Sequence, residues 1–172
     1  MNTKKIFTVL TALLLICAAA VTAAVAAGLP KTFPTFSTKN LEGETVTNSI
    51  FAQSEITMIN FWATWCGPCV MEMPELAQMY EELGEGMVGV LLDADDRGAI
   101  DKAKQILTKA GADFPQLRPS REMSSLINSI VAIPTTIFVD SNGNIVGQTV
   151  VGARSSGEYM RARLAAWEAA YN

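Results

Sequence analysis

Two cysteines, Cys66 and Cys69, stand three residues apart in the segment NFWATWCGPCVMEMPEL, which runs from Asn60 to Leu76. Two thiols at this spacing have three candidate roles. They can form a redox-active pair that exchanges disulfides, a structural disulfide, or part of a metal site. The chain contains no histidine, which excludes Cys-His nucleophile pairs, Ser-His-Asp triads and histidine-ligated metals.

The sequence disfavours the second and third roles of the cysteine pair. A disulfide across two intervening residues closes a very short loop, so it constrains the unfolded chain little. A structural zinc site needs four ligands, and one CxxC motif supplies two. Haem attachment requires histidine directly after the second cysteine, where Val70 stands. We therefore expect no metal site and no cofactor.

The first 27 residues differ from the rest of the chain. Two lysines near the start precede an uncharged, apolar run over residues 6–27, and Ala24-Val25-Ala26 has the small-x-small form of a signal peptidase site. This pattern predicts a signal peptide over residues 1–27 and export to an oxidising compartment. Because a bilayer span needs about 20 apolar residues, an uncleaved membrane anchor through residues 6–27 remains open.

The composition indicates one folded domain over residues 28–172. Hydrophobic residues make up 49% of the chain and charged residues 17%, which is typical of a globular protein. The formal net charge is −4, and no basic patch follows the N-terminal lysines, so we expect no nucleic-acid partner.

Alternating apolar and polar periodicities predict the elements that must position the cysteines. A strand at Ile56–Ala63, apolar on both faces, leads directly into a helix that begins near Cys66 and contains Pro74. The further expected elements are a hairpin that turns at Glu42-Gly43, strands at 87–94, 114–117, 134–140 and 145–152, and helices at 96–111, 122–129 and from Ser155. This order predicts an α/β sandwich with a mixed sheet.

The segment FWATWCGPC resembles the active-site motif of the thioredoxin superfamily. Pro74 stands five residues after Cys69, where thioredoxins have a helix-kinking proline. The segment VAIPTTIFV is similar to the loop that carries the family's cis-proline, so Pro134 is expected to be cis after Ile133, and Gly152 also matches. The resemblance implies a thioredoxin-like three-layer sandwich, in which a mixed central sheet is flanked by helices.

Further features resemble the TlpA/ResA-like extracytoplasmic thiol-disulfide oxidoreductases. They are the N-terminal signal, the N-terminal β-hairpin, a central αβ insertion, Asn60, and a carboxylate at Glu72. This resemblance implies a redox-active disulfide between Cys66 and Cys69. It also implies a location in the bacterial periplasm or on the outer face of the cytoplasmic membrane.

The expected roles of the site residues combine their positions with this resemblance. Cys66, at a helix N-terminus that favours a thiolate, is expected to be the nucleophile, and Cys69, one turn deeper, the resolving thiol. Glu72 is either a group that transfers a proton to or from Cys69 or a solvated helix carboxylate. The expected substrate-binding residues are Trp65, Gly67, Pro68, Ile133 and Pro134.

The function that this resemblance favours is an exported protein-disulfide reductase. Its clients would be disulfide-containing proteins such as apocytochromes, and a membrane electron donor of the DsbD/CcdA type would re-reduce it. A disulfide oxidase or isomerase remains an alternative, although Gly67-Pro68 resembles the reducing thioredoxins. A copper-handling chaperone would carry CxxxC and a distal histidine, and a peroxidase would carry Pro-x-x-x-Thr-x-x-Cys. The chain has neither pattern at Cys66.

Overall fold

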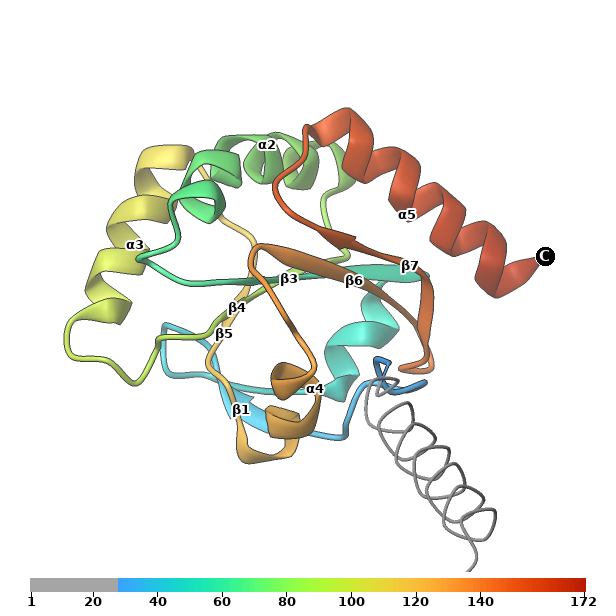
Figure 1. Ribbon diagram of the computed structural model, residues 1–172, viewed down its shortest axis with the longest axis horizontal. Coiled ribbons are helices and arrows are strands. Elements are labelled where there is room, and N and C mark those ends of the chain that lie inside the picture. Colours follow the sequence, from blue (N-terminus) through green and yellow to red (C-terminus); the bar gives the residue numbers. More distant parts are fainter. Residues whose placement is uncertain (1–27) are drawn as a thin grey trace, which may run out of the picture.

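The computed structural model describes residues 28–172, so the predicted signal peptide or anchor at 1–27 lies outside the described residues. Within the described part, no helix has both the length and the apolar character needed to cross a membrane. The strands are β1 (Ser37–Lys39), β2 (Thr45–Thr47), β3 (Ile56–Trp62), β4 (Met87–Leu91), β5 (Gln116–Leu117), β6 (Thr135–Asp140) and β7 (Ile145–Val151). The α-helices are α2 (Gly67–Leu83), α3 (Ala99–Ala110), α4 (Ser124–Asn128) and α5 (Ser156–Tyr171) (Figure 1).

A five-stranded mixed sheet in the order β5-β4-β3-β6-β7 forms the centre of the molecule. β4 runs parallel to β3 and β5 parallel to β4, whereas β6 runs antiparallel to both β3 and β7. All seven residues of β3 are buried, as expected for a strand with apolar residues on both faces. The central strand β3 therefore ends shortly before Cys66, at the edge of the sheet where the cysteine pair lies.

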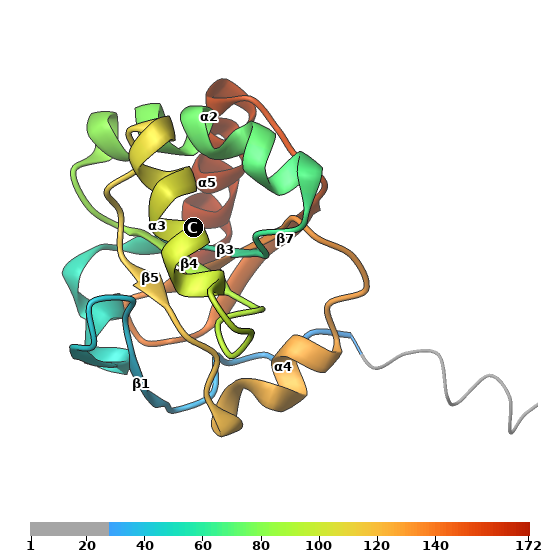
Figure 2. The same ribbon diagram turned by 90° about the vertical axis from the view of Figure 1, so that its left-hand side faces the viewer.

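Helices cover both faces of this sheet, which gives three layers (Figure 2). On one face, Met58 and Trp62 of β3 pack in a cluster with buried residues of α2, α3 and α5. On the other face, Ile59 and Phe61 pack with residues of the N-terminal segment and α4. This alternation follows the two-residue period of a strand. It confirms the predicted thioredoxin-like sandwich.

The N-terminal hairpin and the central αβ insertion are both present. β1 and β2 pair antiparallel, and Gly43 occupies the turn with a φ of 88°, a conformation that glycine adopts without a Cβ clash. The Thr38 hydroxyl donates to the Arg118 carbonyl at 2.7 Å, so the hairpin is joined to the chain just after β5. α3 and β5 follow β4 and form the predicted insertion, with Gly111 ending α3 in a left-handed conformation.

Two predicted helices differ in how closely they match the structure. The helix expected at 122–129 is a 3₁₀ turn at Arg121–Met123 followed by the short helix α4. A run with four serines and asparagines favours local side-chain hydrogen bonds over a longer α-helix, and the Ser129 hydroxyl indeed donates to the Leu126 carbonyl. The helix expected from Ser155 is present as α5, and Ser155 and Glu158 form a capping box at its start.

Candidate active site

The cysteine pair lies at the junction between β3 and α2. Cys66 is the N-cap residue of α2, and its sulfur is bonded to the sulfur of Cys69 at 2.02 Å. The backbone N–H of Cys69 points back at the Cys66 sulfur with an N–S distance of 3.3 Å. Since Gly67 and Pro68 form the first turn, the proline's missing N–H leaves no hydrogen bond unmade there. The Cys66 sulfur thus lies where free N–H groups and the helix dipole favour negative charge.

The two cysteines differ in exposure. The exposed fraction is 5% for Cys66 and 0% for Cys69, whereas the neighbouring Trp65 is 68% exposed. A partner's sulfur therefore has access to Cys66 first, whereas Cys69 is reached only through Cys66. The assignment of Cys66 as the nucleophile and Cys69 as the resolving thiol stays a prediction.

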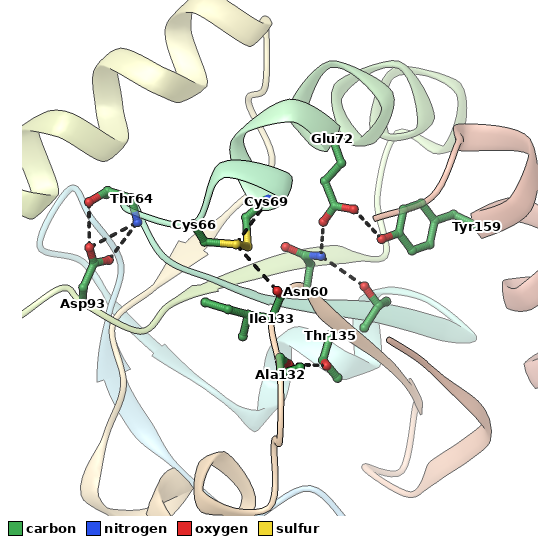
Figure 3. The surroundings of a disulfide bond; sticks show 11 residues. Asn60, Thr64, Cys66, Cys69, Glu72, Asp93, Ala132, Ile133, Thr135 and Tyr159 are labelled. Carbon is green, nitrogen blue, oxygen red and sulfur yellow. Dashed lines mark hydrogen bonds between the residues drawn. A yellow bond between two sulfur atoms is a disulfide. The ribbon is translucent and has the colours of Figure 1, made fainter. Parts of the chain in front are cut away.

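The loop before β6 lies next to the disulfide, on the side that faces away from α2 (Figure 3). The Ile133–Pro134 peptide bond is cis, as predicted, and the Ile133 carbonyl oxygen lies 3.7 Å from the Cys66 sulfur. The Thr135 hydroxyl donates to the Ala132 carbonyl at 2.7 Å and braces this turn. The structure thus brings Ile133 and Pro134 together with the cysteine pair, although 67 residues separate Cys66 from Ile133.

Asp93 organises the segment before Cys66, a role that sequence reasoning missed. The sequence places Asp93 in the strand expected at 87–94, but β4 ends at Leu91 and Asp93 lies in the turn that follows. Its buried carboxylate accepts hydrogen bonds from the Thr64 hydroxyl at 2.6 Å and from the Thr64 N–H at 3.1 Å (Figure 3). One signal was available: β3 and β4 are parallel neighbours, so the residues after their carboxyl ends meet at one edge of the sheet.

Glu72 is buried beneath the helix rather than solvated, with 3% of its surface exposed. Its two carboxylate oxygens accept separate hydrogen bonds, one from Asn60 Nδ2 at 2.9 Å and one from the Tyr159 hydroxyl at 2.8 Å. Burial raises the pKa of Glu72 above its usual 4.5, and these two hydrogen bonds and the charge of Arg154 offset part of that rise. The solvated interpretation of Glu72 is therefore wrong.

Tyr159 is the second functional candidate that sequence reasoning missed. It is 1% exposed and comes from α5, 87 residues after Glu72. Burial and the negative Glu72 carboxylate raise the pKa of the Tyr159 hydroxyl, so it remains a donor at neutral pH. No short motif marks a tyrosine at such a separation, and only the packing of α5 against α2 brings the two side chains together.

We predict that Glu72 makes the stability of the oxidised protein decline with rising pH. Below about pH 4.5 Glu72 is protonated in both the folded and the unfolded state. Above that pH the unfolded chain releases the proton more readily than the folded protein, because the folded pKa is raised, and folding stability falls until the folded pKa is passed.

Urea denaturation of the wild type and of Glu72→Gln across this pH range measures the effect. The free energy of unfolding of the Gln variant is expected to improve relative to the wild type as pH rises above 4.5. Parallel pH profiles for the two proteins would contradict the raised pKa.

Within residues 28–172, no cluster of three or more acidic, histidine or cysteine side chains is arranged to hold a metal ion. What the site offers is a disulfide at a helix N-terminus, with one accessible sulfur, one buried sulfur and a buried carboxylate below them. These are the parts that dithiol–disulfide exchange requires.

Comparisons with known proteins agree with this geometry. The model of the AhpC/TSA family matches residues 29–148. The thiol-disulfide oxidoreductase ResA of Bacillus anthracis is 28% identical over 121 residues, which cover 70% of this chain and 68% of that protein.

Two solved structures extend the comparison to the fold. A thiol:disulfide interchange protein of the thioredoxin family from Chlorobium tepidum TLS has 25% identity and a TM-score of 0.64, covering 83% of this chain and 99% of that one. StoA from Bacillus subtilis, at 22% identity and a TM-score of 0.61, covers 81% and 99% and supports the fold. The chain therefore belongs to the AhpC/TSA family, and its thioredoxin-like fold carries the cysteine pair of a thiol-disulfide oxidoreductase.

Proposed function

We propose that this thiol-disulfide oxidoreductase works as an exported reductase of disulfides in client proteins. The observation that carries the proposal is the position of the Cys66 sulfur, which caps α2 and lies 3.3 Å from the Cys69 nitrogen. A thiolate at this position is stabilised, and the neighbouring exposed Trp65 marks the accessible side.

The reaction then has two exchange steps. The Cys66 thiolate attacks one sulfur of a client disulfide, a mixed disulfide forms, and the client's other sulfur leaves as a thiolate that takes up a proton. Cys69 loses its proton and attacks the Cys66 sulfur, which forms the Cys66–Cys69 disulfide and releases the second client thiol. The client gains two electrons and two protons, and the oxidoreductase loses two electrons, the proton of Cys69 and the proton that Cys66 had already released on ionising.

Client binding involves the surface around Cys66. A client segment would lie along the cis-proline loop, where the backbone of Ile133 before Pro134 offers strand-like pairing. Trp65 would supply apolar contact, and the short Gly67-Pro68 turn would leave room for a chain to approach the sulfur. The position of the Ile133 oxygen, 3.7 Å from the Cys66 sulfur, supports this arrangement.

The reducing direction predicts a low reduction potential. Gly67-Pro68 is the dipeptide of thioredoxins, and the anionic Glu72 beneath the site disfavours a nearby thiolate, which favours the disulfide. We expect the Cys66–Cys69 pair to equilibrate nearer to thioredoxin, at about −270 mV, than to DsbA, at about −120 mV. Equilibration in glutathione buffers of graded ratio, followed by thiol alkylation and mass analysis, measures this. A midpoint near the DsbA value would make the protein an oxidase instead.

Export and re-reduction complete the proposal. Residues 1–27 support export because of their two lysines, apolar run and Ala24-Val25-Ala26 site. A membrane donor of the DsbD/CcdA type would return two electrons to the disulfide, and apocytochromes are one client class. A fusion of residues 1–31 to a reporter that works only outside the cytoplasm is expected to be active. A silent reporter would argue for a cytoplasmic protein.

A further inference from the structure

Asn60 holds a buried polar atom that has no partner when the cysteines are oxidised. The residue is fully buried in the middle of β3, on the face that packs against α2, where Met58 and Trp62 are its neighbours on the strand. Its amide nitrogen donates to Glu72 Oε1 at 2.9 Å and to Thr136 Oγ1 at 3.1 Å. Its Oδ1 accepts no hydrogen bond from any group within residues 28–172. A buried acceptor without a donor is rare and destabilising, so it calls for a physical reason.

The orientation of the Asn60 amide is determined by its neighbours. The Glu72 carboxylate is an acceptor, and only the NH₂ end of the amide can face it without repulsion. Rotating the amide by half a turn would place Oδ1 against a carboxylate and would lose the bond to Thr136. Glu72 and Thr136 therefore hold the oxygen end of Asn60 away from themselves.

That oxygen end is turned toward the cysteines. Figure 3 shows the Asn60 amide beside the disulfide, with its oxygen toward Cys69 and its nitrogen toward Glu72. Neither sulfur of a disulfide carries a hydrogen, so Cys69 has nothing to donate in the oxidised protein. A reduced Cys69 carries an S–H group, which is a weak hydrogen-bond donor. The fully buried Cys69 has no water to use instead.

We propose that Asn60 Oδ1 is the hydrogen-bond acceptor for the Cys69 thiol in the reduced protein. Oδ1 then has this partner only when Cys69 is reduced. When a partner dithiol reduces the disulfide, two electrons break the Cys66–Cys69 bond and the partner dithiol becomes a disulfide. One proton ends on the Cys69 sulfur, and the new S–H donates to Oδ1. The inference rests on the proposed opening and closing of this bond, but it holds for either direction of electron flow.

This contact has two consequences for the site. A hydrogen bond to the protonated form keeps Cys69 as a thiol, and the Cys66 sulfur at the helix N-terminus is then the one that ionises. The bond also stabilises the reduced state relative to the oxidised state, in which Oδ1 stays unpaired. Asn60 therefore sets the reduction potential and the order of ionisation.

The S–H stretching band in the infrared spectrum tests the contact directly. The full chain carries Cys17→Ser, so that Cys66 and Cys69 are its only thiols, and the Cys66→Ser variant of this protein isolates the Cys69 band. We expect the Cys69 band at the lower frequency of a hydrogen-bonded thiol. Asn60→Leu, which has a similar shape and no acceptor, is expected to move it to the frequency of a free thiol. Asn60→Asp, which keeps an oxygen at this place but removes the donor to Glu72, is expected to retain the low frequency.

The reduction potential gives a second, independent readout. A Glu72→Gln background removes the carboxylate's charge but keeps an amide oxygen that can accept from Asn60 Nδ2, and the bond to Thr136 remains. In this background, adding Asn60→Leu is expected to shift the equilibrium about threefold to tenfold toward the disulfide. A tenfold shift corresponds to about 30 mV. Thr57→Val is the matched control. Thr57 also has a buried, unpartnered oxygen on β3, but its side chain lies on the opposite face of the strand from Asn60, so the potential should not change.

The outcomes separate this inference from the proposed function. A free-thiol band for Cys69 in the protein with Asn60 intact would overturn the inference, whether or not any Asn60 variant folds. An equal potential with and without Asn60→Leu in the Glu72→Gln background would do the same. A disulfide that partner dithiols cannot open in the Cys17→Ser protein would instead contradict the proposed function.

Discussion

Replacing Cys66 with serine is expected to lower the rate of client-disulfide reduction by about a thousandfold or more, to the level without enzyme. The hydroxyl of serine remains protonated at neutral pH and cannot replace a thiolate in an exchange reaction. The measurement is turnover of a disulfide-containing protein in the presence of a dithiol. The fold should survive the change, because Cys66 is a helix N-cap and serine is a preferred N-cap residue.

Replacing Cys69 with serine is the matched variant. Cys66 can still attack, but no thiol remains to resolve the mixed disulfide, so client proteins are expected to accumulate in covalent complexes with Cys66. Non-reducing electrophoresis followed by mass spectrometry identifies the linked cysteine. If the Cys66→Ser protein trapped clients and the Cys69→Ser protein did not, the two roles would be reversed.

A single alanine at Gly147 is expected to destabilise the oxidised protein by about 2–5 kcal/mol. Gly147 has a φ of 67°, which costs a residue with a Cβ about 1–2 kcal/mol. A Cβ at this position would also lie 2.7 Å from the Ala166 Cα on α5, and overpacking of this kind adds about 1–3 kcal/mol. The strand β7 and the helix α5 would have to move apart, and α5 carries Tyr159.

Gly43→Ala provides the control for this prediction. Gly43 also has a positive φ, 88°, but a Cβ there would meet open space. It is expected to lose only the conformational part, about 1–2 kcal/mol. Urea denaturation of the two variants, at an unchanged m-value, compares the free energies of unfolding. Equal losses for Gly43→Ala and Gly147→Ala would show that α5 yields to the added methyl group.

The sequence by itself determined the parts of this protein that depend on neighbouring residues. The apolar run of β3 is buried on both faces, and α2 begins directly after Cys66, because strand periodicity and helix-start signals act over a few residues. The turn at Gly43 and the capping box at Ser155 were predictable for the same reason. The cis bond before Pro134 was predictable only through the family resemblance.

Only the tertiary structure decided the surroundings of the cysteines. From the sequence, Glu72 could be either a solvated or a buried carboxylate on its helix. Its burial depends on contact with Tyr159, which lies 87 residues later. The bond between Thr64 and Asp93 spans 29 residues, and the bond between Asn60 and Thr136 spans 76. Such contacts leave no local pattern, because they arise when separate elements pack and their buried polar groups find partners. The same packing leaves Asn60 Oδ1 without a hydrogen-bond partner in the described part of the chain.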